Sequence, residues 1–205
     1  MKTKIYFIRH GETSWNVEKR YQGWTDIELS EVGVKQAKLL GERFKNINVD
    51  KIYASPLKRA FETARQIGEN TGVDVVIDES FKEINFGEWE GVTISELTEK
   101  YGDEYLKFFN TPWATTFPGD GSFKNVESRM AKGIDRILKE DKGKSIVIVS
   151  HGGLLKILLL YVMGLPQDFY KKVWLDNTAV SLIEVNSEGK PLLRILNDKS
   201  HLDNM

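Results

Sequence analysis

Short, nearly continuous apolar runs alternate along this chain with longer segments in which apolar residues recur every three or four positions. The short runs are rich in β-branched residues and show little polar alternation, which is typical of strands buried on both faces of a sheet. They predict strands over Lys4–Ile8, Lys51–Ala54, Val73–Ile77, Ser145–Val149, Val180–Val185 and Leu192–Leu196.

The segments with helical spacing predict four helices between these strands. The first covers about Ser30–Phe44, where the serine suits the N-cap. The second begins at Ser55-Pro56, a capping residue followed by proline at the first helical position, and ends near Gly72. A third lies near Val126–Leu138, and a fourth follows Gly152-Gly153. The fourth is apolar nearly all round, which indicates a helix in the core.

Strands that alternate with helices imply an α/β fold with a largely parallel sheet covered on both faces. Only residues 186–191 separate the last two strands, so we expect a hairpin and one antiparallel strand near the end of the chain. The segment Ser80–Asn125 is rich in aromatic residues and glycine and lacks strand alternation. We interpret it as an insertion, at about residues 80–125, that lies over one edge of the sheet.

Length and composition narrow the class of protein. A chain of 205 residues is ordinary for one domain, which we place over residues 1–205, and 40% hydrophobic with 29% charged residues is typical of a globular protein. The absence of cysteine excludes a disulfide scaffold, a thiolate zinc site, an iron–sulfur cluster and a cysteine nucleophile. A net charge of −1 argues against a nucleic-acid partner.

The apolar runs are short. The first, Ile5–Ile8, is too short for the core of a signal peptide. The longest, Ile157–Met163, is well below the roughly 18 residues that a membrane span needs. We therefore expect a cytoplasmic protein without a membrane partner.

Three of the predicted strands end in side chains suited to phosphate chemistry. Ligands of open parallel sheets bind beyond the carboxyl ends of the strands. There the chain places Arg9-His10, Ser55 with Arg59 in the helix after it, and Ser150-His151. Guanidinium groups bind phosphate oxygens through paired hydrogen bonds, and the helix start at Gly152-Gly153 offers free backbone N–H groups. A histidine with one unprotonated ring nitrogen is a nucleophile, and a carboxyl group must then move the protons.

Two other interpretations remain open from the residues alone. A histidine after a strand is commonly a satisfied polar residue, although two of them beside two arginines favour an anion site, because buried like charges need a counter-ion. Two histidines can also ligate zinc, but the sequence has no His-x-His, no His-Glu-x-x-His and no adjacent acidic cluster. It also lacks the glycine-rich signatures of nucleotide-binding loops.

Five ordered segments closely resemble the histidine phosphatase superfamily, also called the phosphoglycerate mutase-like family. The segments are Phe7–Asn16, Tyr21–Asp26, Ala54–Ala60, Glu83–Gly91 and Val149–Gly153. The resemblance extends over nearly the whole chain. It implies a three-layer α/β/α sandwich with a mixed, mostly parallel sheet, and an insertion that covers the active site. It implies no metal and no organic cofactor.

The resemblance also implies roles for particular residues. His10 would be the nucleophile that becomes phosphorylated, and Glu83 would be the proton donor. The residues alone do not distinguish Glu83 from Glu88 or Glu90. Residues implied for the phosphate pocket and its mouth are Arg9, Arg59, His151, Asn16 and Gly152, with Gln22 and Gly23 at the mouth.

The family contains both phosphatases and mutases. Cofactor-dependent mutases typically carry Glu-Arg-x-Tyr-Gly in the fourth segment, whereas Glu83 here begins Glu-Ile-Asn-Phe-Gly, followed by residues 89–91, Trp-Glu-Gly, as in the phosphatase branch. The chain and its insertion are also shorter than in typical mutases. We therefore predict a phosphomonoester hydrolase acting through a phosphohistidine intermediate. A cofactor-dependent phosphoglycerate mutase is the alternative. A non-catalytic phosphate-binding module is less favoured, because such relatives usually lose a catalytic residue.

The expected substrates are small phosphorylated metabolites, as for the similar broad-specificity and α-ribazole phosphatases. Residues 117–122 differ from the Pro-Gly-Gly-Glu-Ser that many relatives have there. We expect an apolar wall that favours hydrophobic or aromatic phosphomonoesters, formed by Trp15, Tyr21, Trp24, Phe109 and Trp113. His201 lies in a polar tail, 197–205, that we expect to be solvated, and it is assigned no role.

Overall fold

Six strands form one mixed sheet in a computed structural model that describes residues 1–117, 121–203 and 205. The strands are β1 (Thr3–Arg9), β2 (Lys51–Ala54), β3 (Val75–Ile77), β4 (Ser145–Ser150), β5 (Val180–Val185) and β6 (Pro191–Asp198). Their order is β3-β2-β4-β1-β5-β6. The first four of these are parallel to one another, and β5 is antiparallel to both of its neighbours. The predicted mixed, mostly parallel sheet is confirmed.

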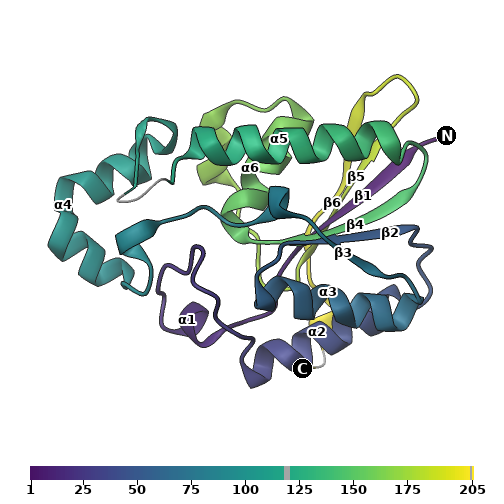
Figure 1. Ribbon diagram of the computed structural model, residues 1–205, viewed down its shortest axis with the longest axis horizontal. Coiled ribbons are helices and arrows are strands. Elements are labelled where there is room, and N and C mark those ends of the chain that lie inside the picture. Colours follow the sequence, from purple (N-terminus) through teal and green to yellow (C-terminus); the bar gives the residue numbers. More distant parts are fainter. Residues whose placement is uncertain (118–120, 204) are drawn as a thin grey trace.

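Side chains that alternate along β1 belong to two separate cores, one on each face of the sheet. Tyr6 and Ile8 pack in a cluster with residues of α2 (Glu31–Phe44) and α3 (Lys58–Thr71). Ile5 and Phe7 pack in a cluster with residues of α5 (Phe123–Glu140) and α6 (Gly152–Met163). Figure 1 shows the resulting layers, with the sheet between these two pairs of helices. The predicted α/β/α sandwich follows from this alternation.

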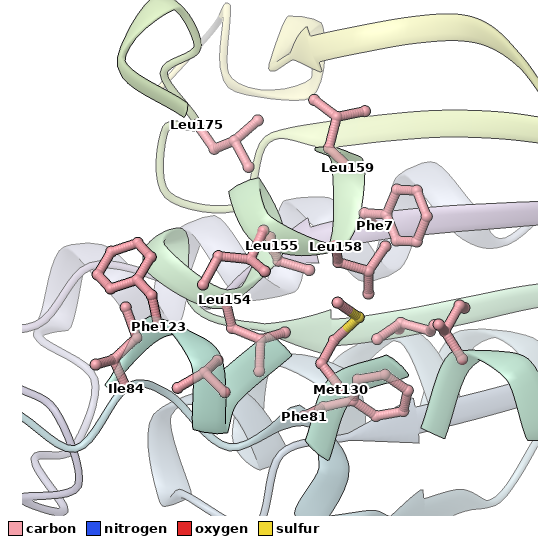
Figure 2. Close-up of a cluster of buried hydrophobic side chains, with 14 of the residues drawn as sticks. Phe7, Phe81, Ile84, Phe123, Met130, Leu154, Leu155, Leu158, Leu159 and Leu175 are labelled. Atoms are coloured by element: carbon pink, nitrogen blue, oxygen red, sulfur yellow. The ribbon is translucent and has the colours of Figure 1, made fainter. Parts of the chain in front are cut away.

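Helix α6 is almost entirely apolar because it is covered on several sides. Its side chains meet Phe7 of the sheet and Phe123 and Met130 of α5 (Figure 2). Six of its residues, Leu154, Leu155, Ile157, Leu158, Leu159 and Leu160, are buried. Each contributes about 1.5–3 kcal/mol of hydrophobic stabilisation. This packing fixes the start of α6, and with it His151, relative to the sheet.

Segment 80–125 contains a helix that we did not predict. Helix α4 (Ile94–Asn110) starts with a capping box, in which Thr93 accepts the amide of Glu96 and the glutamate accepts the amide of Thr93. Its axis bends at Gly102, which has a φ of 38°. Most of the aromatic residues around it pack on one another, and Trp89 is their buried centre. The aromatic composition therefore builds a local core.

Several predicted boundaries were wrong. Helix α3 begins at Lys58, not at Ser55-Pro56, and its N-cap Leu57 has no side-chain capping bond. Helix α5 starts at Phe123, capped by Ser122, three residues before the predicted start. Strand β3 lacks the predicted first two residues, because Gly72 ends α3 in the left-handed region and the chain needs residues to turn. Residues 118–120 of the divergent 117–122 segment lie outside the described part of the chain.

The C-terminal tail is docked on α2 and was wrongly predicted to be solvated. Its short 3-10 helix η5 (Ser200–Leu202) presents His201 between two partners. Arg43 of α2 donates to His201 Nδ1 at 3.3 Å, and Thr178 Oγ1 lies 3.2 Å from Nε2. The helices of the described residues include none that is long and apolar enough to cross a membrane.

Candidate active site

The carboxyl ends of three adjacent strands bring the predicted residues together. Arg9 at the end of β1 pairs with Ser150 at the end of β4, and Ala54 at the end of β2 pairs with Val149. The amide of His10 donates to the carbonyl of Ser150 at 2.9 Å. The residues that follow β1, β2 and β4 therefore share one edge of the sheet, as the sequence predicted.

The ring of His10 is oriented for attack through Nε2. Its Nδ1 lies 2.7 Å from the carbonyl oxygen of Gly11. Because a carbonyl only accepts, Nδ1 carries the proton in this bond and Nε2 keeps its lone pair. Burial, together with the positive charges of Arg59 and Arg9, holds the pKa of His10 well below its usual value. The neutral imidazole, which is the nucleophilic form, is thus favoured.

His151 lies beside His10 at the N-cap of α6, with the two ring centroids 5.2 Å apart. Its Nε2 is 2.7 Å from the hydroxyl of Ser55. The same hydroxyl accepts the amide of Leu57 at 3.3 Å. The remaining ring nitrogen, Nδ1, is buried without a protein partner. Burial, Arg59, His10 and Arg9 lower the pKa of His151 well below its usual value.

Two buried guanidinium groups flank the histidines. Arg59 is completely buried, and its Nη1 and Nη2 donate to the carbonyls of Thr25 and Gly23, each at 2.8 Å. Arg9 donates through Nη1 to the carbonyl of Leu175 at 2.8 Å. The Nε atoms of both arginines are buried without a partner, and neither arginine forms an ion pair with any residue that the structure describes.

Burial alters the pKa values of these guanidinium groups. It lowers the pKa of Arg59 to about 10, and it also lowers that of Arg9, against the opposing charge of Glu83 in both cases. With its pKa at about 10, Arg59 is still protonated at neutral pH. A pair of buried cations with unused donors is suited to an anion with several oxygens.

Glu83 lies against the start of α6. Its carboxylate accepts the amides of Gly153 at 3.1 Å and Leu154 at 2.9 Å, and also that of Ile84 at 3.0 Å. The positive end of the helix dipole stabilises negative charge there. The sequence predicted that the amides at Gly152-Gly153 are free for phosphate, and this was wrong for Gly153, because Glu83 occupies it.

The structure also separates the three candidate acids. Glu90 accepts the amides of Trp24 and Thr25, each at 2.8 Å, and the amide of Phe86 at 3.1 Å. It therefore ties two loops together. Glu88 is exposed. Only Glu83 combines burial with contact to the catalytic edge, a distinction that depends on contacts far apart in the sequence.

The remaining predicted residues lie around this edge with different partners. Asn16 accepts the amide of Thr13 at 3.0 Å in a capping box. Gln22 is buried, with its Oε1 unpartnered. Gly23 has a φ of 54°, and a Cβ there would lie 2.0 Å from Glu90, so a side chain is excluded. A Cβ at Gly152 would lie 3.4 Å from Arg9 Nε, which places this backbone beside the guanidinium.

Sequence reasoning missed several residues that support the site. Arg129 of α5 donates to four carbonyls between Glu79 and Glu83. Asn177 donates to the carbonyl of His10 at 2.9 Å. Ser55 was expected at this edge of the sheet, but its contact with His151 was not predicted. Their sequence context carries no signal of these contacts. Among the residues with described positions, no group of three or more histidine, aspartate and glutamate side chains is arranged to hold a metal ion.

The residues of the predicted apolar wall lie in different environments and do not form one surface. Tyr21 packs in the aromatic core against Phe86 and Trp89. Phe109 is 60% exposed. Trp24 donates through its ring nitrogen to the carbonyl of Glu83 at 2.8 Å and lies close to the site.

The profile of the histidine phosphatase superfamily (branch 1) matches residues 5–198, nearly the whole chain. The chain belongs to this superfamily, which confirms the predicted resemblance and the prediction of a phosphatase enzyme that acts on small phosphorylated metabolites.

Three relatives illustrate the similarity. Phosphoserine phosphatase 1 of Hydrogenobacter thermophilus is 32% identical over 97% of this chain and 94% of its own. Phosphoserine phosphatase of Entamoeba histolytica, solved in complex with 3-phosphoglyceric acid, is 37% identical over 98% of this chain and 99% of its own, with a TM-score of 0.87. A probable phosphoglycerate mutase, GpmB of Yersinia pestis, is 30% identical over 98% of this chain and 95% of its own.

Proposed function

We propose that this protein hydrolyses small phosphomonoesters through a phosphohistidine formed on His10. The observation that carries the proposal is the free Nε2 of His10 in a pocket with unused buried nitrogens, namely Nε of Arg9, Nε of Arg59 and Nδ1 of His151. A phosphoryl group supplies the negative charge and the acceptor oxygens that these atoms lack in the unliganded protein.

In the first step, Nε2 of His10 attacks phosphorus, and the bond between phosphorus and the ester oxygen breaks. The carboxyl of Glu83 gives a proton to the leaving oxygen. Its carboxylate then takes a proton from water, whose oxygen attacks the phosphohistidine. The P–N bond breaks, inorganic phosphate leaves and His10 regains its lone pair. The amides of Gly153 and Leu154 hold the carboxylate in place between the two proton transfers.

The pocket residues divide the work of stabilising the phosphoryl group. Arg9, Arg59 and His151 bind its oxygens, with the backbone of Gly152 and the side chain of Asn16 beside them. Gln22 and Gly23 line the mouth of the pocket, and Gly23 also orients Arg59. No metal or organic cofactor takes part in the proposed steps. Segment 80–125 delivers Glu83 and covers the site within one domain that spans residues 1–205. A cytoplasmic location stays a prediction.

Phosphoserine is a suitable first substrate, because the phosphoserine phosphatases are similar to this chain along nearly its full length. A mutase is the second candidate, because a probable phosphoglycerate mutase is similar over nearly the full length too. The phosphatase-like sequence that begins at Glu83 and the short insertion favour hydrolysis.

The test compares wild type with His10→Ala on phosphoserine and p-nitrophenyl phosphate, measured as release of inorganic phosphate. His201→Gln is the matched control, since it removes a histidine whose hydrogen-bond partners are Arg43 and Thr178, which have no role in the proposed steps. We expect the alanine variant to lose at least 10³-fold in kcat and the control to keep wild-type turnover. Undiminished turnover of His10→Ala would contradict the proposal. Primer-dependent conversion of 3- to 2-phosphoglycerate that outruns hydrolysis would favour the mutase instead.

A further inference from the structure

Lys156 is a cation beside the proposed site that the proposed mechanism does not use. It lies in α6, four residues after Gly152, which faces Arg9, and three residues after Gly153, which binds Glu83. Residues three and four apart share one face of a helix, and helical side chains tilt toward the N-terminus. The ammonium group of Lys156 is therefore directed along the face that carries Glu83 and Arg9.

An aromatic platform supports this ammonium group. Nζ of Lys156 lies 3.8 Å from the ring centroid of Tyr170, which packs edge-on against Phe123 and Trp113. Lys156 is half-buried and forms no ion pair with the residues described in the structure. Its charge is thus held by a ring face, in a position open to an added anion.

The electrostatics agree with this location. Burial lowers the pKa of Lys156 to about 8, with Glu83 opposing the shift and Arg9 adding to it. The charges of both groups thus act on the ammonium, in agreement with the helical spacing. A lysine with this pKa is still mostly protonated at pH 7.

The position of the leaving group determines which part of the substrate lies near Lys156. In the proposed reaction Glu83 protonates the leaving oxygen, so the organic part of the substrate extends on the Glu83 side of the phosphoryl group. Lys156 lies one helical turn along that side. Arg9 and Arg59 already supply the cations for the phosphoryl group, which leaves Lys156 for a second acidic group.

We propose that Lys156 binds a carboxylate on the leaving group, and that it selects small phosphomonoesters that carry a carboxylate over those that do not. This proposal rests on the proposed phosphatase function and adds a specificity residue to it. A compact ammonium on a flexible stem suits a carboxylate whose position varies among short acids.

The test uses 3-phosphoglycerate and glycerol 3-phosphate, two substrates that differ only in a carboxylate against a hydroxymethyl group. The measured quantity is the ratio of their kcat/KM values. We expect Lys156→Met to lower the ratio at least tenfold and Lys156→Arg to keep part of it. Lys132→Met, which removes the same charge from an exposed position of α5, should leave the ratio at its wild-type value. Circular dichroism and thermal melting verify that each variant is folded.

A ratio within twofold of wild type in Lys156→Met, whether both activities fall together or neither changes, overturns the specificity role. Failure of the proposed function is distinguishable from this outcome, because wild type would then hydrolyse neither substrate nor p-nitrophenyl phosphate, and the specificity role would fall with it. A lower ratio that comes from a higher KM for 3-phosphoglycerate supports direct binding of the carboxylate.

Discussion

Arg129 gives the sharpest prediction about how the fold positions the acid. From α5, its Nη1 donates to the carbonyls of Glu79 and Ser80 at 2.7 and 2.8 Å. Its Nη2 donates to the carbonyls of Lys82 and Glu83 at 2.6 and 3.1 Å. One guanidinium group thus fastens the chain that carries Glu83 to a helix of the core. We predict that Arg129→Met damages catalysis as well as stability.

The magnitude follows from these four bonds. A hydrogen bond from a charged donor contributes about 1.5–3 kcal/mol, but the four bonds share one partly exposed side chain, so about 2–4 kcal/mol is expected from all of them together. Loss of the clamp also loosens the backbone that carries Glu83, and a displacement of its carboxyl by about 1 Å can cost on the order of 10²-fold in rate. We expect kcat to fall about 30- to 100-fold and KM to change by less than about threefold, because Arg129 does not touch the phosphoryl site.

The assay combines steady-state kinetics on phosphoserine with urea unfolding of the same preparations. Arg129→Lys is the matched control, because it keeps the charge but has no planar fork to reach four carbonyls, so an intermediate kcat is expected. A variant that loses stability and keeps wild-type kcat would refute the reasoning. It would show that Trp24, which donates to the Glu83 carbonyl, and Ser150, which donates to the Phe81 carbonyl, suffice to hold the segment.

Three further predictions concern the titratable groups. Glu83→Gln should lower kcat about 10²–10⁴-fold with little change in KM. Because Glu83 also takes the proton from water, the two esters are compared by kcat/KM, which should fall less for p-nitrophenyl phosphate, whose leaving group needs no proton; an equal loss of kcat/KM on both esters would contradict proton donation. Because the pKa of His10 is lowered, kcat/KM should stay level as the pH falls through 6.5, and an acid limb centred at that ordinary histidine value would contradict a neutral His10. His201, with its pKa lowered to about 4, should be neutral in the folded protein and protonated in the unfolded chain between about pH 6.5 and 4. Stability should therefore fall as the pH drops through this window, and unfolding curves of His201→Gln should show a weaker dependence there.

The site at the carboxyl ends of the strands could be predicted because the residues that mark it are adjacent in the sequence. An apolar run followed by Arg9-His10 or Ser150-His151 marks both the strand and its functional end, and parallel neighbours then bring these ends together. Hydrophobic alternation within each strand likewise indicates coverage on both faces. Helix α4 was detectable in principle, since its Thr93 and Glu96 form a capping box, but the dense aromatic composition pointed to an irregular insertion.

Other features depend on contacts that no local pattern contains. Ser55 has the sequence context of an N-cap, yet its hydroxyl serves His151, 96 positions away. Glu83 is distinguished from Glu90 only by the start of α6, some 70 positions away. His201 is half-buried because Arg43, 158 positions earlier, lies beside it. In each case the neighbouring sequence suggests one role for a polar side chain, and a partner far away in the sequence gives it another.

The whole-chain charge of −1 conceals how the site uses its cations. Arg9 and Arg59 lower the pKa of His10, so the same charges that attract a phosphoryl group also keep the nucleophile unprotonated before it arrives. Once a dianion is bound, it offsets these charges and favours the protonated form of His10. Attack therefore uses the lone pair on Nε2, which stays free because the carbonyl of Gly11 retains the Nδ1 proton. The Gly11 carbonyl thus sets the tautomer of His10, and the two arginines keep its ring neutral before the phosphoryl group binds.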